Sequence, residues 1–206
     1  MSQLRYLIPV LELRDHNPDD TAFMERAREH GAVRYEWRDY EQIADDLKRA
    51  VLISEDARFM EHIGFDWRGI RHAIERNEEA GRPVAGGSTV TQQLAKNLFL
   101  SSEKSYARKI QEALIALMLE ATLSKKRILE LYLNTAQWGN RLFGAQAAAR
   151  HYFDVDAQTL SPAQAAQLAV LLPRPSYYDV RGTTVYVEQR PLWIQKQLPL
   201  VRIPPP

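Results

Sequence analysis

The first candidate for chemistry is a stretch in which acids lie beside aromatic residues. Residues 54–66 read SEDARFMEHIGFD and hold four acids, one histidine and two phenylalanines. Apolar surface next to a carboxylate desolvates it and raises its pKa, which suits general acid or base work near neutral pH. The alternative is a capped helix end with solvated acids. Glu61-His62 is not a zinc signature, because no second histidine lies at helical spacing.

A glycine loop that opens into a helix forms the second candidate. Residues 86–97 read GGSTVTQQLAKN. Free N–H groups at a helix start favour anions, and the hydroxyl of Ser88 adds a donor. Gln93, Lys96 and Asn97 are spaced to share one helix face, which suits a phosphate or a sugar. The segment is not a Walker loop, because a glycine stands where the lysine is required. The alternative is a turn with an N-cap.

The third candidate is a cationic helix start. Lys104, Arg108 and Glu112 step by four along one expected helix face, with Lys109 beside them. An acid before a base is the better order for simple helix stabilisation, and this order is the reverse. Cations near a helix start also oppose the macrodipole. The arrangement therefore favours an anionic ligand, and the alternative is an ordinary charged face.

Helical periodicity dominates the elements that must position these residues. Asp66, Ser124 and Ser161 are expected N-caps, and Asp19 or Asp20 is expected to cap the earliest helix. The expected helices span residues 20–30, 40–53, 66–80, 89–98, 105–123, 124–133, 145–152 and 161–171. Strand patterns are confined to residues 32–37 and 183–187, and residues 203–206 read as a frayed tail. The expected class is mainly α.

The composition narrows the function classes. The chain has 206 residues, of which 45% are apolar and 26% charged, as is typical of one globular domain. The absence of cysteine excludes disulfides, thiolate metal sites and cysteine nucleophiles. A net charge of +1 argues against a nucleic-acid binder, although residues 96–127 carry seven basic and three acidic side chains. No apolar run approaches the ~18–20 residues that span a bilayer, and no signal-peptide cleavage pattern is present.

Taken together, these blocks resemble the peptidoglycan glycosyltransferases, the transglycosylase domains of penicillin-binding proteins and their single-domain relatives. Five family motifs occur in order: EDARFMEHIGFD, GGSTVTQQLAKNLFL, RKIQE, KKRILELYLN and AAARHYF. LLPRPSYY resembles the usual end of the domain. No transpeptidase domain follows, so the chain looks like the monofunctional biosynthetic type.

The resemblance implies a mainly α, lysozyme-like fold with two lobes. The glycosyltransferase domain would cover residues 34–200, and residues 201–206 would form a tail. Residues 1–33 would be an extension that lacks the membrane anchor usual in such relatives. The expected site of action is the outer, periplasmic face of the bacterial cytoplasmic membrane. Leu98, Phe99 and Leu100 would lie near an apolar segment that touches this membrane.

The resemblance also implies that the protein polymerises lipid II and releases undecaprenyl pyrophosphate. Glu55 would be the general base that deprotonates the acceptor's GlcNAc 4-hydroxyl, which attacks C1 of the donor MurNAc with inversion. Glu112 matches the second family carboxylate, near the donor pyrophosphate. The cations expected to stabilise this pyrophosphate are Lys96, Lys104, Arg108 and Lys109. Ser88, Gln93 and Asn97 match positions that contact sugar or phosphate, and Phe59 and His62 would shape the Glu55 pocket.

No cofactor is required by this chemistry, and a divalent cation, magnesium or manganese, is an optional addition near Glu112. The expected partners are lipid II, the growing glycan chain, the membrane surface and other cell-wall synthesis proteins, with no nucleic acid. Two rival hypotheses remain at this point. One is a lysozyme-type glycan-cleaving enzyme with Glu55 as its acid. The other is a non-enzymatic anion-binding module.

Overall fold

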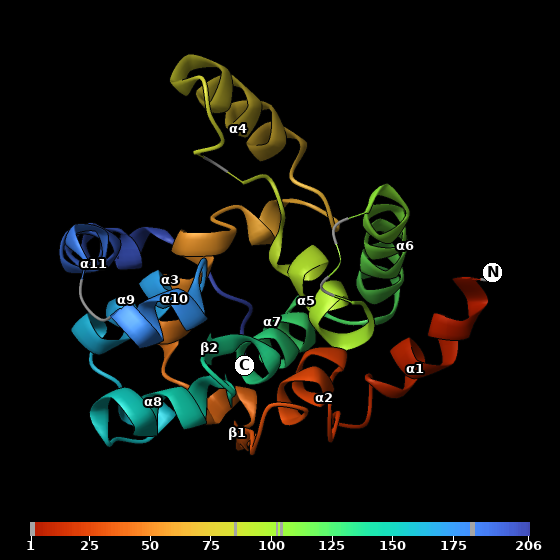
Figure 1. The fold of residues 1–206 in the computed structure, drawn as a ribbon, viewed down its shortest axis with the longest axis horizontal. Helices are drawn as coiled ribbons and strands as arrows, with labels where there is room; N and C mark the ends of the chain where they lie inside the picture. Colours follow the sequence, from red (N-terminus) through yellow and green to blue (C-terminus); the bar gives the residue numbers. More distant parts are fainter. Residues whose placement is uncertain (1–2, 85, 102, 104, 182–183) are drawn as a thin grey trace.

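A computed structural model describes residues 3–84, 86–101, 103, 105–181 and 184–206. The mainly α class is confirmed, since helices surround one small sheet (Figure 1). The helices of the first half are α1 Leu7–Glu12, α2 Ala22–Arg28, α3 Asp45–Glu55, α4 Trp67–Ala80 and α5 Val90–Phe99. Those of the second half are α6 Tyr106–Thr122, α7 Lys125–Thr135, α8 Ala145–Phe153, α9 Pro162–Leu171, α10 Pro175–Arg181 and α11 Val185–Gln197.

Short 3-10 turns and three strands connect these helices. The turns are η1 Gln3–Tyr6, η2 Tyr40–Gln42, η3 Phe59–Glu61, η4 Ala157–Thr159 and η5 Leu198–Leu200. The strands are β1 Arg34–Tyr35, β2 Gln137–Gly139 and β3 Leu142–Phe143, in the spatial order β1-β3-β2. β1 runs parallel to β3, with Arg34 opposite Leu142, whereas β2 and β3 are antiparallel with an irregular register.

Polar caps set the starts of the helices that carry the motifs. The side chains of Asp66, Ser124 and Ser161 accept hydrogen bonds from the first turns of α4, α7 and α9, as expected. For α2 the expected cap was wrong. The side chain of Thr21 accepts the hydrogen bond from Met24, because the carboxylate next to it already accepts from the backbone of Thr21 itself.

The strand expected at residues 183–187 is also wrong for the part that the structure describes. Residues from Val185 onward form the first turns of α11, and Thr184 caps this helix by accepting from the N–H of Val187. β-Branched residues favour strands only when a sheet neighbour is available. Here the cap and the burial of Ile194 in the core decide for a helix. Residue 183 lies outside the described residues.

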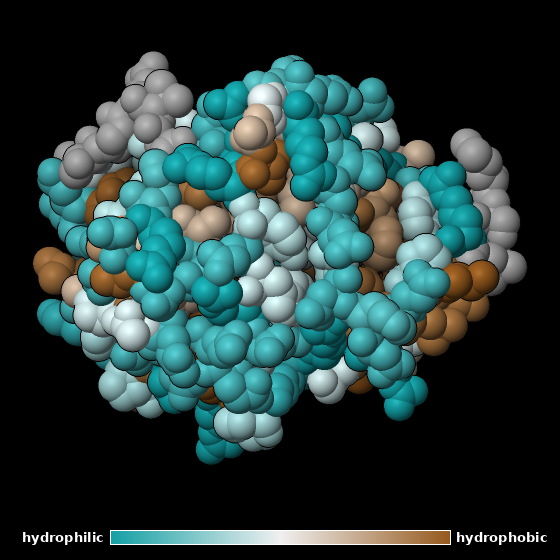
Figure 2. Space-filling model, turned by 90° about the horizontal axis from the view of Figure 1, so that it is seen from below, coloured by the Kyte–Doolittle hydropathy of each residue, from teal (hydrophilic) through white to brown (hydrophobic). Residues whose placement is uncertain are grey.

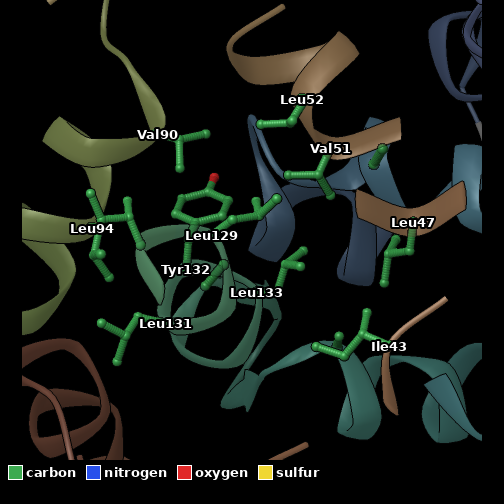
Figure 3. Packing of buried hydrophobic residues seen from close by; sticks show 14 of the residues in the cluster. Ile43, Leu47, Val51, Leu52, Val90, Leu94, Leu129, Leu131, Tyr132 and Leu133 are labelled. Carbon is green, nitrogen blue, oxygen red and sulfur yellow. The ribbon is translucent and has the colours of Figure 1, made fainter. Parts of the chain in front are cut away.

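The core is built mainly by α3, α5, α7 and α9. Leu47 and Val51 of α3, Leu94 of α5 and Leu129 of α7 are fully buried in one cluster (Figure 3). The ends of α3 and α5 are held close together in this way, which brings residues almost 40 positions apart into one site. Tyr132 rises from α7 into the same cluster.

α4 stands away from the other helices at the top of Figure 1, and this gives the two-lobed outline. Only Ala73 of its described residues is buried. The face seen in Figure 2 is largely hydrophilic, with separate apolar areas. Among the described residues, none of the helices has the length and apolar character needed to cross a bilayer.

The C-terminal tail, expected to be frayed, is held against the core. Pro204 is buried, and its carbonyl accepts a hydrogen bond from the Tyr40 hydroxyl at 2.6 Å.

Gly144 offers a direct test of the packing between α7 and α8. Its φ is +83°, and a Cβ there would lie 2.8 Å from the carbonyl oxygen of Asn134. We expect Gly144→Ala to lower the free energy of unfolding by about 2–4 kcal/mol, from backbone strain plus the clash. Gly81→Ala is the matched control, because Gly81 has a φ of +63° with open space around it. Urea unfolding measures both, and equal losses would contradict the clash.

Candidate active site

Glu55 lies at the end of α3, and its carboxylate is held by two side chains. Oε1 accepts from the Ser54 hydroxyl at 3.2 Å, and Oε2 accepts from Nε2 of Gln93 on α5 at 2.8 Å. Burial raises the pKa of Glu55, opposed by these hydrogen bonds and by the charge of Lys96. The negative end of the α3 dipole also disfavours the ionised form. The carboxyl group is thus placed and tuned as a base or acid.

A cavity of about 150 Å³ opens beside this carboxylate. It is lined by residues 53–57 at the end of α3 and by the glycine loop with Ser88 and Thr89. Asp66 and Gly69, at the start of α4, close one side. Residues of the first two sequence motifs therefore line one cavity.

Asp56 ties the loop after α3 to the start of α5. Its Oδ1 lies 2.8 Å from Nε2 of His62, and its Oδ2 accepts from the backbone N–H of Val90 at 3.0 Å. The ring of Phe59 is only 1% exposed and lies edge-on to His62, with 6.4 Å between the ring centroids. Phe59 and His62 therefore lie behind Asp56, outside the residues that line the cavity. They can shape the Glu55 pocket only by holding the loop.

The cations of α6 are organised by Glu112, whose side chain is 3% exposed. Its Oε2 accepts from Nη1 of Arg108 at 2.7 Å, and its Oε1 accepts from Nζ of Lys109. Nζ of Lys109 also donates to the hydroxyl of Ser88 at 3.1 Å. The third motif is thereby joined to the glycine loop of the second.

The ammonium group of Lys96 interacts electrostatically with the carboxylates of both Glu55 and Glu112. Burial lowers the pKa of Lys96, and the positive charges of Arg108 and Lys109 lower it further. The carboxylates of Glu112 and Glu55 act in the opposite direction. The charges of Lys96, Arg108 and Lys109 thus interact with one another and with both carboxylates, and a group of cations of this kind is suited to an anionic ligand.

The remaining expected residues fall in three different places. Gln93 faces Glu55 and also accepts at Oε1 from the hydroxyl of Tyr132, 3.0 Å away. Asn97 is buried on α5, at 8% exposure. Lys104 lies outside the described residues. Among the residues that are described, no group of three or more acidic, histidine or cysteine side chains converges as a metal site would require.

Sequence reasoning missed a buried anchor around Glu120. Its Oε1 accepts from Gly64 N–H at 3.0 Å, from the Thr91 hydroxyl at 2.6 Å and from Nζ of Lys125 at 2.8 Å. The same ammonium lies 4.3 Å from the ring centroid of Phe59. These partners come from the loop after α3, from α5 and from α7. Only the pair with Lys125 is local, and the contacts of Glu120 with Gly64 and Thr91 join distant segments that no local pattern could have brought together.

The raised pKa of Glu55 predicts a stability effect with a definite sign. Because the folded protein holds this proton more tightly than the unfolded chain, its stabilising contribution is complete below the ordinary pKa. That contribution is lost as pH rises through the folded-state pKa. We therefore expect Glu55→Gln to gain stability relative to the wild type as pH rises. Urea unfolding at several pH values measures this difference, with the exposed Glu61→Gln as control. A difference that shrinks with rising pH would contradict the prediction.

Comparison with known proteins places this site in a family. The transglycosylase family model matches residues 21–199. The biosynthetic peptidoglycan transglycosylase of Alcanivorax borkumensis is 66% identical over all of this chain and 84% of its own length. Those of an Azoarcus species and Thiobacillus denitrificans are 54% and 50% identical, over 81% and 98% of this chain and 75% and 90% of their own lengths. The chain therefore belongs to the transglycosylase family, as its five ordered motifs led us to expect.

Proposed function

We propose that this protein polymerises lipid II into β-1,4-linked glycan strands at the outer face of the bacterial cytoplasmic membrane. The observation that carries the proposal is a half-buried carboxylate with a raised pKa beside a group of three interacting cations, within a chain of the transglycosylase family. A base next to a cationic site fits a sugar transfer in which an anion leaves.

Glu55 takes the proton from the 4-hydroxyl of the acceptor GlcNAc. This oxygen forms a bond to C1 of the donor MurNAc while the bond from C1 to the pyrophosphate breaks, so the configuration at C1 inverts from α to β. The electron pair leaves with undecaprenyl pyrophosphate, and the proton stays on Glu55 until solvent removes it. A base whose pKa is raised toward the working pH is effective in this step.

The cation cluster receives the charge that develops on the leaving group. Lys96, Arg108 and Lys109 stabilise the pyrophosphate, and Lys104 is expected to join them. Glu112 keeps Arg108 and Lys109 directed toward one place before substrate arrives. Ser88 does the same for Lys109 from the glycine loop. Such preorganisation saves reorganisation during the reaction.

A lipid-linked substrate requires contact with a membrane. Leu98 and Leu100, which were expected near the segment that touches the membrane, are themselves buried at 7% and 3% exposure, and Phe99 between them is half-buried. Exposed apolar side chains lie on the next helix, α6, where Tyr106 is 94% and Ile110 62% exposed. The same helix carries Arg108 and Lys109. We therefore assign the membrane contact to the start of α6.

Incubation with labelled lipid II tests the proposal directly. We expect the wild type to form polymer and Glu55→Gln to lose about a hundredfold to ten-thousandfold in rate, because the base is removed while the shape is kept. Glu61→Gln is the matched control, since Glu61 is exposed on the same loop. Shortening of preformed glycan without polymer would instead establish a lysozyme-type hydrolase. Binding without turnover would indicate an anion-binding module.

Lys109→Ala tests the leaving-group site. We expect kcat/KM for the donor to fall about tenfold to hundredfold, since one charge-stabilising donor is lost. Lys126→Ala serves as control, because Lys126 pairs with Glu41 and has no contact with Glu112 among the described interactions. Steady-state kinetics with separate variation of donor and acceptor measures the effect. An unchanged kcat/KM for the donor would show that Lys109 does not stabilise the pyrophosphate.

A further inference from the structure

We infer that Tyr132 is a positioning residue for the general base: its hydroxyl orients the Gln93 amide so that the NH₂ group faces Glu55. The inference rests on the proposed function for its kinetic consequence, and on geometry for the arrangement itself. The Tyr132 hydroxyl lies 3.0 Å from Oε1 of Gln93, and Nε2 of Gln93 lies 2.8 Å from Oε2 of Glu55. These two hydrogen bonds link α7, α5 and α3.

The direction of these hydrogen bonds follows from the chemistry of the three groups. Burial raises the pKa of Tyr132 well above its ordinary value, so its hydroxyl keeps its proton and can donate. The amide of Gln93 has one end that only accepts and one that only donates. When Oε1 accepts from Tyr132, the NH₂ group must face the carboxylate. That orientation favours the ionised form of Glu55, which is the form that acts as a base.

Tyr132 can act on the reaction only through Gln93. It is 1% exposed and packs in the core cluster with Val51, Leu52 and Val90. Figure 3 shows its hydroxyl end pointing away from α7, on the side of Val90 and Leu52. Substrate therefore has no access to its ring. A phenylalanine would keep the ring and its packing and would remove only the hydroxyl.

Without that hydroxyl, Oε1 of Gln93 loses the hydrogen bond that holds it away from Glu55. A flipped amide would place Oε1 against the carboxylate, which is favourable only when Glu55 holds a proton. Loss of the hydroxyl therefore favours protonated Glu55 and raises its pKa. Less of the base is then ionised at a given pH, so the acid limb of the rate profile moves to higher pH.

Other charged groups also act on Glu55, and each has a known position. Asp56 is its neighbour in sequence, Lys96 lies on α5, and Asp66 lines the same cavity. α9 and α11 both pack on α3. α9 carries no titratable side chain, and the charged residues of α11, Glu188, Arg190 and Lys196, are not among the groups that shift the pKa of Glu55. None of these charged groups is hydrogen-bonded to the Tyr132 hydroxyl in the described interactions. A change in the rate profile of Tyr132→Phe is therefore caused by the amide.

The first experiment compares Tyr132→Phe with the wild type in the lipid II assay across pH. We expect kcat/KM below the plateau to fall about threefold to tenfold, the cost of one hydrogen bond, and the plateau to change less than twofold. Tyr40→Phe is the matched control, a buried tyrosine whose hydroxyl donates to Pro204. An unchanged acid limb, or an equal loss at every pH, would overturn the inference.

The second experiment tests whether Tyr132 acts through Gln93. If it does, adding Tyr132→Phe to Gln93→Leu should cause no further loss at low pH, because the amide that it orients is already absent. Independent, multiplicative losses from the two substitutions would overturn the inference. This cycle also separates positioning from general loosening of the core, which would persist in the double variant.

A third measurement does not depend on activity. NMR titration of ¹³C-labelled glutamate carboxyl groups follows Glu55 directly, with Glu55→Gln used to assign its signal. We expect the Glu55 signal to titrate at higher pH in Tyr132→Phe than in the wild type, and an unmoved titration would overturn the inference. If the wild type made no polymer, the proposed function would fail while this titration still decided the role of Tyr132.

Discussion

The structure depends on keeping one half-buried carboxylate, that of Glu55, ionisable. Glu55 sits at the carboxyl end of α3, where burial and the helix dipole both oppose its charge. Ser54 and Gln93 supply the hydrogen bonds that make the charge tolerable. Gln93 can do so because α5 packs against α7 and shares one core with α3. The ionised form of Glu55 is thus tolerated only when these helices are packed in this arrangement.

The loop after α3 is also held in place by hydrogen bonds, but from other side chains. Asp56 joins it to the first N–H of α5, and Gly64 is fixed from both sides by Glu120 and Thr89. Gly64 has a φ of +73°, which glycine adopts at little cost. The ion pair of Glu120 and Lys125 joins a carboxylate that is 4% exposed to a lysine side chain that is 20% exposed. Its value lies in geometry, since loop, α5 and α7 share one acceptor oxygen.

Whether a feature of the fold or site could be predicted depended on how far apart in the sequence the interacting residues lie. The caps of α4, α7 and α9 and the shared face of Gln93 and Lys96 are local, so spacing and residue type were enough. The contacts of Glu120 and Tyr132 join segments 29 or more residues apart, apart from the pair with Lys125. Nothing near either residue in the sequence indicates its partner. The strand expected at residues 183–187 failed because a threonine cap outweighed β-propensity.

The two halves of the site are coupled through Lys96. Its pKa is lowered by burial and by two neighbouring cations, so in the free protein its charge is held under unfavourable conditions. An arriving pyrophosphate would relieve that strain, and the charge leaving C1 would relieve it further. In the proposed mechanism Glu55 would experience the opposite change, because the proton that it takes would remove a negative charge from a poorly solvated place. Each sugar transfer would then lower the electrostatic cost at both Lys96 and Glu55. The burial that disfavours these charges in the free protein would therefore favour the forward step.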